Sequence, residues 1–377
     1  MAEPASVTLD PTRTPSRVIV VGGGLVGLCC AWRLLLRGHD VQLIDPGHPL
    51  PNGSQAALGV LMARVCHRSS GRGWRLRQQS LELWNLWRQE LASRDLPIAW
   101  RQGLLLLAAD AADQERHQRL LADRRRQSLG LELWDQSRLE RLSPALPFGA
   151  LSGLYSHDDG QIDPLGALEA IGKDAGRLGI RCLKGSAATL ENGGRGWRVN
   201  LQGGGHCQAD WVVLCAGLGL RQPLASLGRE LAMEPVLGQA LELERTDAPP
   251  ARAGGGRWTW PGVIHWQGIN LIPRPDQAGG DRLWLGATLE PGLRGDDDSV
   301  QTLRSLNGAA PAWLEQARER RRWQGLRTRP LGRPAPVLEP IAAGVLLASG
   351  HYRNGVLLAP ATATWVVEQI EAGGTEP

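Results

Sequence analysis

The chain has 377 residues, of which 42% are hydrophobic, and this is enough to bury a large core divided between two domains. Its net charge is +4, and nearly all of its basic residues are arginines. We attribute this arginine content to genome base composition rather than to nucleic-acid binding. Six cysteines without a C-x-x-C pair indicate a reducing cytoplasm, and eight histidines without metal-ligand spacing argue against a metal site.

The first block with a clear pattern runs from Arg17 to Asp45. It follows 16 residues, rich in proline and small polar side chains, that we expect to form a disordered leader. Val18 to Val21 is an apolar β-branched run that predicts a buried strand. Apolar residues then recur at helical spacing up to Gly38, which predicts one helix. A second short strand is expected from Val41 to Ile44, immediately before Asp45.

Three glycines between that strand and helix, Gly22, Gly24 and Gly27, have the G-x-G-x-x-G spacing. The spacing allows a tight turn, close approach of a pyrophosphate to the backbone, and close packing of helix on strand. The helix N-terminus offers N–H groups to phosphates, and Asp45, 23 residues after Gly22, can accept hydrogen bonds from ribose hydroxyls. The block therefore predicts a dinucleotide site, whereas its glycines and Arg33 argue against a membrane span or a signal peptide.

The middle of the chain alternates helical, strand and turn patterns. Helices are expected at residues 76–91, 111–129, 139–146 and 165–178, the last started by Asp163-Pro164 in a Gly160–Pro164 turn. Strands are expected at residues 103–109, 180–183, 197–201, 210–216, 270–274 and 283–288. The runs Arg124–Arg126 and Arg320–Arg322 are interpreted as solvated faces of polar helical segments. The small residues of Gly53–Leu61 suit either an ordinary loop or a backbone on which a flat ring lies.

The C-terminal stretch has its own strand, turn and helix. Gly344–Ser349 predicts an apolar strand, Gly350–Gly355 a polar turn, and Val356–Ile370 a helix interrupted by Pro360. This order repeats that of the opening block. It suits either a structural βα unit or a second helix N-terminus that stabilises negative charge.

Taken together, the motifs resemble the flavin-dependent amine and D-amino acid oxidase family, in particular its glycine oxidases of thiamine biosynthesis. The resemblance spans nearly everything after the leader. Besides the opening glycines, it is carried by SQAALGVL (Ser54–Leu61), IPRP with LWLGATLEPG (Ile272–Gly292), WQGLRTRP (Trp323–Pro330) and SGHYRNGVLLAPATA (Ser349–Ala363). It implies an α/β fold with a discontinuous Rossmann-type FAD-binding domain and a second, mainly antiparallel-sheet domain for the substrate. The implied FAD-binding domain comprises residues 17–75, 150–225 and 326–377, and the implied substrate-binding domain comprises residues 76–149 and 226–325.

The resemblance also implies which residues contact FAD and the substrate. The predicted FAD-binding residues are Gly22, Gly24, Leu25, Val26, Gly27, Ile44, Asp45, Gly53, Ser54, Leu58, Gly59, Val60, Ala188, Gly217, His351, Tyr352, Arg353, Asn354, Gly355, Val356 and Leu357. Arg327 and Arg353 correspond to positions that bind the substrate carboxylate, which a guanidinium matches with two parallel hydrogen bonds. The sequence departs from the family pattern at two places. Asn270 is at a substrate-contacting position where the family member with the most similar pattern has tyrosine. After Arg327, the segment Gly332–Pro336 replaces an Asp-Gly pair that is common in the family.

The predicted function is that of an FAD-dependent oxidase. A small amino acid, most simply glycine, would be oxidised to the imine and then glyoxylate with release of hydrogen peroxide, and the product would supply thiazole synthesis. The expected partners are this amine and dioxygen, without nucleic acid or membrane, and a homo-oligomer is compatible with the sequence. No protein residue is predicted to act as a general base, because the amine can bind in its neutral form.

Three alternatives remain open at this point. The first is a dehydrogenase of D-amino acids or secondary amines that passes electrons to a quinone or carrier protein. The second is a tRNA-modifying flavin oxidase, which only the arginine-rich surface favours. The third is a flavin-binding protein without catalytic activity.

Overall fold

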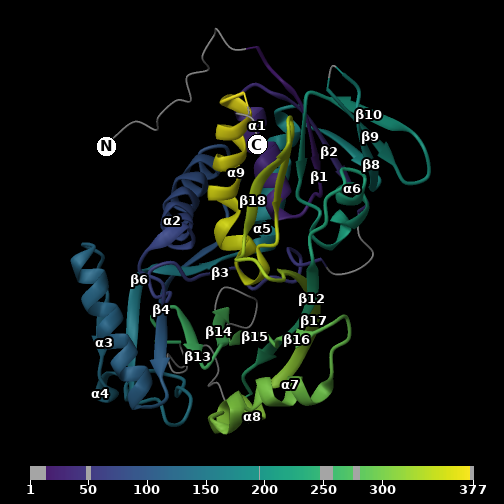
Figure 1. The fold of residues 1–377 in the computed structure, drawn as a ribbon. Coiled ribbons are helices and arrows are strands. Elements are labelled where there is room, and N and C mark those ends of the chain that lie inside the picture. The colour runs from purple at the N-terminus through teal and green to yellow at the C-terminus, as the bar shows by residue number, and fades with distance from the viewer. Residues whose placement is uncertain (1–13, 48–51, 195, 247–257, 275–280, 374–377) are drawn as a thin grey trace.

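The computed structural model describes residues 14–47, 52–194, 196–246, 258–274 and 281–373, arranged in two parts that lie one above the other in Figure 1. The upper part is built on six strands: β1 (Arg17–Val21), β2 (Asp40–Asp45), β7 (Arg181–Lys184), β11 (Trp211–Leu214), β18 (Val337–Ala342) and β19 (Val345–Ser349). Their order in the sheet is β18-β19-β11-β1-β2-β7, and all neighbours are parallel except β18 and β19. This mostly parallel sheet agrees with the Rossmann-type domain that the family resemblance implied.

Both faces of this sheet are buried, which explains why its strands are apolar rather than alternating. In β1, Val18 and Val20 pack on one layer, whereas Ile19 and Val21 pack on the other. The first layer consists of helices α1 (Leu25–Leu36), α2 (Gly71–Ala92), α5 (Pro164–Arg177) and α9 (Gly355–Glu371). The second layer consists of a small antiparallel sheet, β8 (Ala187–Asn192), β9 (Trp197–Leu201) and β10 (His206–Ala209), together with η1 (Gly217–Leu220) and α6 (Arg221–Ala225).

The lower part in Figure 1 is built on a larger, mostly antiparallel sheet. Its strands are β3 (Val60–Leu61), β4 (Trp100–Ala108), β5 (Glu132–Trp134), β6 (Ser152–Ile162), β12 (Met233–Glu244), β13 (Val263–Trp266), β14 (Ile269–Arg274), β15 (Arg282–Gly286), β16 (Glu290–Pro291) and β17 (Arg318–Pro330). The main path is β16-β12-β15-β14-β13-β4-β6-β3, and β17 and β5 pair with β12 and β6. Among the described strand pairs of this sheet, β13 and β4 form the only parallel pair, and the others are antiparallel.

One longer helix, α3, and several short helices cover this second sheet. They are α3 (Ala111–Arg126), α4 (Gln136–Glu140), α7 (Asp297–Arg304), η3 (Leu306–Gly308) and α8 (Ala312–Gln316). Leu303 of α7 and Trp313 of α8 share one apolar cluster with Leu241 of β12 and Leu271 of β14. The predicted fold class, α/β with a Rossmann-type sheet and a second, mainly antiparallel sheet, is confirmed.

Several local predictions need correction. The helix expected to start at residue 76 starts at Gly71, and the helix expected at residues 139–146 is instead the short α4. The turn expected at residues 160–164 is the end of β6 up to Ile162, because tertiary pairing with β4 extends that strand. Arg320–Arg322 lie on a strand, β17, and Arg124 is completely buried rather than solvated.

The C-terminal helix α9 continues past Pro360, contrary to the predicted interruption. A proline lacks the N–H that would bond the carbonyl four residues earlier, here that of Val356. The indole N–H of Trp84 donates to this carbonyl instead, at 2.9 Å, and the Ser80 hydroxyl accepts the N–H of Ala361 at 3.1 Å. Helix α2 therefore supplies the partners that the proline takes away, and the helix continues.

Packing bears on how the chain divides into domains. Helix α2, which the predicted boundaries place in the substrate-binding domain, packs against α9 with Trp84 and Trp87 in the core of the upper part. We propose the predicted two-domain division with α2 moved to the FAD-binding domain.

The first 13 residues of the predicted leader lie outside the described residues. Within the described part of the chain, no helix is long and apolar enough to cross a membrane.

Candidate active site

The turn after β1 is shaped by two glycines that no other residue can replace without moving backbone. Gly22 has φ of +106°, and a Cβ there would lie 2.7 Å from Ala216 Cα in the segment after β11. A Cβ on Gly27 would lie 1.9 Å from the Gly22 carbonyl oxygen. The strand, the turn and the first turn of α1 are therefore in direct backbone contact.

The N-terminus of α1 presents unpaired donors next to this turn. Gly24 is the N-cap residue and provides no side-chain cap. The Leu25 N–H donates to the Ser54 hydroxyl at 2.9 Å, whereas the N–H groups of Val26 and Gly27 have no acceptor among the described residues. Free N–H groups and the helix dipole together make this end of α1 a site for an anion such as a pyrophosphate.

Asp45 closes the same region from the end of β2. One carboxylate oxygen accepts the Gly23 N–H at 2.6 Å, and the other accepts the Gly47 N–H at 2.8 Å. These two bonds fix the carboxylate and leave lone pairs for further donors. Asp45 is half-buried and lines the cavity described next, so its position suits ribose hydroxyls.

A cavity of about 1120 Å³ extends from this turn to the large sheet. It is lined by most of the predicted site residues: Gly22, Gly24, Val26, Gly27, Ile44, Asp45, Gly53, Ser54, Leu58, Gly59, Val60, Gly217, Asn270, Arg327, His351, Tyr352, Arg353, Asn354, Gly355 and Val356. The structure thus brings together residues that are more than 300 positions apart in the sequence.

Three predicted residues do not line the cavity. The side chains of Leu25 and Leu357 are buried in the apolar core beneath the sheet, because each faces the inner side of its helix. Ala188 lies on β8, one residue beyond the segment Gly185–Ala187, which does line the cavity. Only the backbone N–H of Leu25 takes part in the site, through Ser54.

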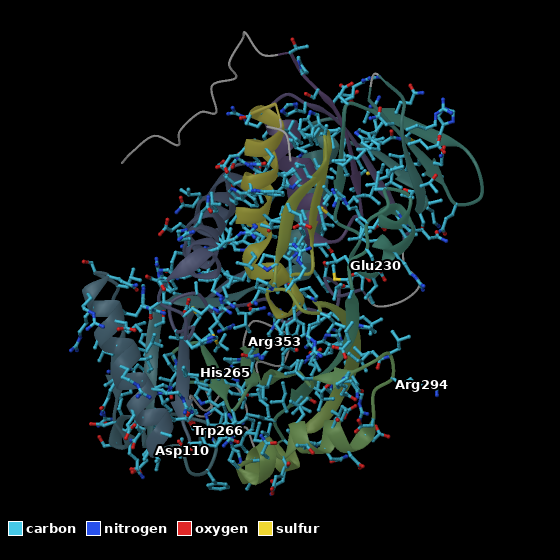
Figure 2. All side chains as sticks on the ribbon, viewed as in Figure 1. Asp110, Glu230, His265, Trp266, Arg294 and Arg353 are labelled. Carbon is cyan, nitrogen blue, oxygen red and sulfur yellow. The ribbon has the colours of Figure 1, made fainter. Side chains whose placement is uncertain are left out.

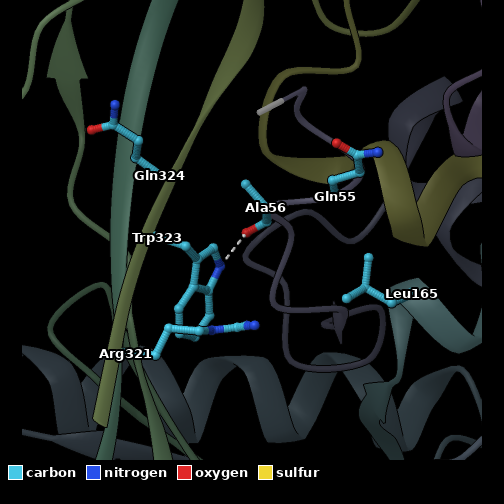
Figure 3. Close-up of a pocket in the computed structure, with 6 residues that line it drawn as sticks. All are labelled: Gln55, Ala56, Leu165, Arg321, Trp323 and Gln324. Carbon is cyan, nitrogen blue, oxygen red and sulfur yellow. Dashed lines mark hydrogen bonds between the residues drawn. The ribbon is translucent and has the colours of Figure 1, made fainter. Parts of the chain in front are cut away.

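The segment from Asn52 to Ala57, which lines the middle of the cavity, is held against β17. The indole N–H of Trp323 donates to the Ala56 carbonyl at 3.1 Å, as Figure 3 shows beside a shallow surface pocket, and Asn52 pairs with Leu326. A Cβ on Gly325 would lie 2.3 Å from Ala56 Cβ, so the glycine allows this close approach.

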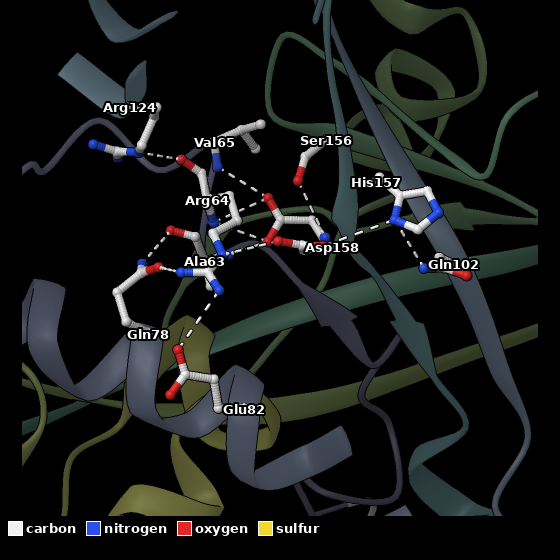
Figure 4. A network of polar contacts seen from close by, with 11 residues as sticks. Ala63, Arg64, Val65, Gln78, Glu82, Gln102, Arg124, Ser156, His157 and Asp158 are labelled. Atoms are coloured by element: carbon white, nitrogen blue, oxygen red, sulfur yellow. Dashed lines mark hydrogen bonds and ion pairs between the residues drawn. The ribbon is translucent and has the colours of Figure 1, made fainter. Parts of the chain in front are cut away.

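The next wall, residues 63–68, is held by a buried acid and a buried base that sequence reasoning missed. Asp159 accepts the N–H groups of three residues labelled in Figure 4, Ala63, Arg64 and Val65, at 2.8–3.0 Å. Burial raises the pKa of the Asp159 carboxyl group. Arg124 donates to the carbonyls of residues 64, 66 and 68 at 2.7–2.9 Å, and burial lowers its pKa. The Asp159 carboxyl group thus satisfies N–H groups of this loop, and the Arg124 guanidinium group satisfies its carbonyl groups.

Arg327 lies on β17 and lines the end of the cavity that is formed by the large sheet. Its guanidinium lies over Gly238 of β12, where a Cβ would come within 2.2 Å of both terminal nitrogens. One of these nitrogens donates to the carbonyls of Leu237 and Thr288, at 3.2 and 3.1 Å. Burial and the nearby charge of Arg353 lower the pKa of Arg327 to about 10. The charge of Glu290 opposes this shift of the pKa, although no carboxylate of the described residues forms an ion pair with Arg327.

A second arginine faces the same space from the C-terminal turn. Arg353 lies in η4 (Tyr352–Asn354), is exposed, and forms no hydrogen bond or ion pair with the described residues. Figure 2 shows it where the two parts of the molecule meet. The turn is anchored by Arg77, which donates to Asn354 Oδ1 at 2.9 Å and to the Met62 carbonyl at 3.0 Å.

Asn270 forms a pair with a histidine that was not predicted. Its Nδ2 donates to the Gly286 carbonyl at 3.2 Å, and its Oδ1 lies 2.9 Å from Nδ1 of His265. Burial, above all, lowers the pKa of His265 to about 4, and the charge of Arg353 acts in the same direction. The missed signal is the two-residue turn Gln267-Gly268, both with positive φ, because it places residues 265 and 270 opposite each other in a hairpin.

Comparison with known proteins gives one family over almost the whole chain. The model of FAD dependent oxidoreductases matches residues 17–369. The glycine oxidase of Geobacillus kaustophilus is 27% identical over 368 residues, covering 94% of this chain and 92% of the relative. The glycine oxidase of Pseudomonas putida is 28% identical over 392 residues, covering 96% and 95%. The crystal structure of the Geobacillus kaustophilus enzyme superposes with a TM-score of 0.83 at 24% identity, covering 96% of each chain.

Proposed function

The chain belongs to the FAD dependent oxidoreductase family, and we propose that within it the protein is an oxidase of a small amino acid, with glycine the leading substrate. FAD is its cofactor, and the resemblance to amine and amino acid oxidases is confirmed at the level of the family. One observation carries the choice of substrate. Two guanidinium groups, those of Arg327 and Arg353, face one cavity end without a carboxylate partner among the described residues, which leaves room for an anion.

The residues at the other end fit FAD. The free N–H groups of Val26 and Gly27 suit the pyrophosphate, and Asp45 suits the ribose. The backbone of Gly53–Val60 and the turn at residues 351–355 line the region between these groups and Arg327. When bound there, FAD supplies an acceptor for the hydride of the substrate carbon and passes the electrons to dioxygen.

Arg327 would orient the substrate by its carboxylate. Its guanidinium remains charged near pH 7, since its pKa is about 10, and it offers the planar pair of donors that a carboxylate accepts. Leu237 and Thr288 hold the guanidinium in place, so little of its freedom is lost on binding. A fixed carboxylate leaves the carbon that carries the amine directed toward the middle of the cavity.

The amine end would be held in its neutral form. The two guanidinium charges disfavour an ammonium group nearby, and the cavity-lining residues close to Arg327 include no carboxylate. We therefore assign no general base. Water would hydrolyse the imine to glyoxylate and ammonia, and dioxygen would be reduced to hydrogen peroxide. The product would supply thiazole synthesis. A cytoplasmic location agrees with six free cysteines.

The test is anaerobic mixing of the yellow holoenzyme with glycine, sarcosine and D-alanine, followed by admission of air. Bleaching of the visible flavin band by one of them, and peroxide in one-to-one yield with the amine consumed after air enters, is the expected result. A holoenzyme that none of these bleaches would overturn the proposal.

A second candidate is a dehydrogenase that passes electrons to a quinone. It is favoured by two exposed leucines that line the cavity, Leu218 and Leu289, which are 37% and 44% exposed and offer an apolar surface to such an acceptor. Bleaching by an amine without peroxide release in air, restored by a soluble quinone, would select this candidate.

A further inference from the structure

The orientation of the Asn270 amide is determined by the backbone next to it. Its neighbour at 3.2 Å is the carbonyl oxygen of Gly286, which can only accept a hydrogen bond. The amide nitrogen must therefore face Gly286, since the flipped amide would set two oxygens against each other. The amide oxygen then faces His265.

This orientation also determines the proton on His265. Its Nδ1 lies 2.9 Å from the Asn270 oxygen, so Nδ1 must carry the hydrogen and donate it. His265 is neutral near pH 7, because burial and the charge of Arg353 keep its pKa at about 4. A neutral imidazole with its proton on Nδ1 has an unprotonated Nε2, which is an acceptor.

The ring of His265 belongs to the end of the cavity that holds the two arginines. His265 lines the cavity together with Asn270, Gly238, Arg327 and Arg353, and its Nε2 has no hydrogen-bond partner in the described part of the chain. Figure 2 shows His265 near Arg353, where the two parts of the molecule meet. This end of the cavity is lined by the two cations Arg327 and Arg353, whereas Glu290, whose charge acts on Arg327, is not among the lining residues. The space beside His265 therefore suits an anion and a neutral donor.

We infer that Nε2 of His265 accepts a hydrogen bond from the amino group of the substrate, and that Asn270 makes this possible by fixing the proton on Nδ1. The inference rests on the proposed function and deepens it. It defines the substrate class as amino acids whose neutral amine carries at least one hydrogen, namely primary and secondary amines. A tertiary amine has no such hydrogen and gains nothing from His265.

The experiment compares wild-type holoenzyme with His265→Leu and His265→Gln in anaerobic stopped-flow reduction by glycine, sarcosine and N,N-dimethylglycine. For glycine and sarcosine we expect His265→Leu to lower the reduction rate constant divided by Kd by about tenfold to a hundredfold, as for a lost buried hydrogen bond. Reduction by N,N-dimethylglycine should be equally slow in both proteins. His265→Gln, whose amide oxygen reaches the place of Nε2, should recover part of the loss.

Binding of acetate, followed through the flavin spectrum, is the control for an intact site. Acetate has a carboxylate and no amine, so its Kd should be the same in wild type and His265→Leu. If wild type is reduced and His265→Leu is reduced equally well, the inference fails while the proposed function stands. If no amino acid reduces wild type, both fail. An equal loss for all three substrates would show a structural role only and would also overturn the inference.

The role of Asn270 is tested by a double-mutant cycle. Asn270→Leu should lower reduction by glycine severalfold, because His265 is then free to place its proton on Nε2. The same change in the His265→Leu background should have no effect, since the residue acts through the histidine. Additive losses would show that Asn270 contacts the substrate independently and would remove it from the inference.

Discussion

The two ends of the cavity are built in different ways. The glycine-turn end uses backbone N–H groups and one carboxylate from the contiguous residues 17–45, and its shape depends on positions where no Cβ fits. The arginine end uses side chains from β13, β14, β17 and the turn before α9. Of these, Asn270 and Arg327 are held by hydrogen bonds to carbonyls of β12, β15 and the segment that follows β15. The first end is therefore specified by local sequence, whereas the second exists only after the large sheet has formed.

The difference predicts how each end fails on mutation. A change at the glycine-turn end moves backbone and should cost the cofactor together with the fold. A change at the arginine end removes a side chain from a formed cavity and should cost the substrate alone. Each experiment below tests whether this separation holds, beginning with the largest effect.

The largest effect is expected from Gly27→Val. The first side-chain atom would lie 1.9 Å from the Gly22 carbonyl oxygen, and neither the helix nor the turn can retreat because both are packed on the sheet. We expect protein that carries no FAD, measured as the ratio of visible to ultraviolet absorbance, and that unfolds at a much lower temperature. Gly176→Ala, in a helix position with open space around it, is the matched control and should be neutral or slightly stabilising. A yellow, stable Gly27→Val protein would contradict the backbone account.

Arg124→Met tests the support of the cavity wall between the two ends. The change leaves the carbonyls of residues 64, 66 and 68 without their buried donor, which should lower the free energy of unfolding by about 3 kcal/mol. Chemical denaturation of the holoenzyme gives this value. Arg126→Met on the same helix is the control, because its side chain is 74% exposed and, among the residues that the structure describes, pairs only with Asp123 at the surface. Equal stability of the two variants would mean that the buried arginine does not hold the loop.

The sequence alone was sufficient to predict the glycine-turn end of the cavity. It was not sufficient to predict that Arg124 and Asp159 support the neighbouring wall. The strand, turn, helix and acid of residues 17–45 were predicted with nearly correct bounds because each depends on its neighbours in the chain. Arg124 was interpreted as one of three solvated arginines, and only tertiary packing distinguishes it from the exposed Arg125 and Arg126. The buried Asp159 was missed in the same way, because it lies on β6 directly before the residues 160–164 that were predicted to form a turn.

At the arginine end, sequence patterns gave residues but not their geometry. Arg327 and Arg353 were predicted through family resemblance, and the structure places both at one cavity end, although their roles stay a proposal. His265 was missed because its significance depends on pairing with Asn270 across a hairpin. The Gln267-Gly268 turn carried that information, but a turn fixes only the register and not what the paired side chains face.

Arg327→Ala is the direct test of the arginine end. In its proposed role Arg327 gives the substrate carboxylate two charge-assisted hydrogen bonds, and their loss should lower kcat/KM for glycine by about a hundredfold or more, mainly through KM. FAD should remain bound, because the cavity at the glycine turn is untouched. Arg322→Ala on the same strand, where the side chain pairs with surface carboxylates, is the control and should leave the kinetics unchanged. Loss of FAD from Arg327→Ala would show that the two ends are not separable.

The pH dependence of stability tests the turn that carries Arg353. His351 is 7% exposed, its Nε2 lies 2.9 Å from the Thr362 hydroxyl, and burial lowers its pKa to about 4. In the unfolded chain its pKa is about 6.5, so the unfolded state binds more protons between these values. Its contribution is therefore complete above pH 6.5 and falls as the pH drops toward 4, by up to about 3 kcal/mol. Denaturation of wild type and His351→Asn across this range should give a difference that shrinks with falling pH, and a constant difference would contradict this.

The smallest effect is expected from Ser54→Ala, which removes a hydroxyl that connects the segment Asn52–Ala57 to the start of α1. That hydroxyl accepts the Leu25 N–H at the start of α1, while the Ser54 backbone N–H donates to Asn52 in the segment held by β17. Removing it should cost about 1 kcal/mol, which is a five- to tenfold rise in the Kd for FAD, because the helix end loses one acceptor but keeps its other donors. Titration of the apoprotein with FAD measures the change, and KM for glycine should not move. A larger effect on glycine than on FAD would show that the glycine turn also sets the position of the substrate, and the separation between the two ends would then be lost.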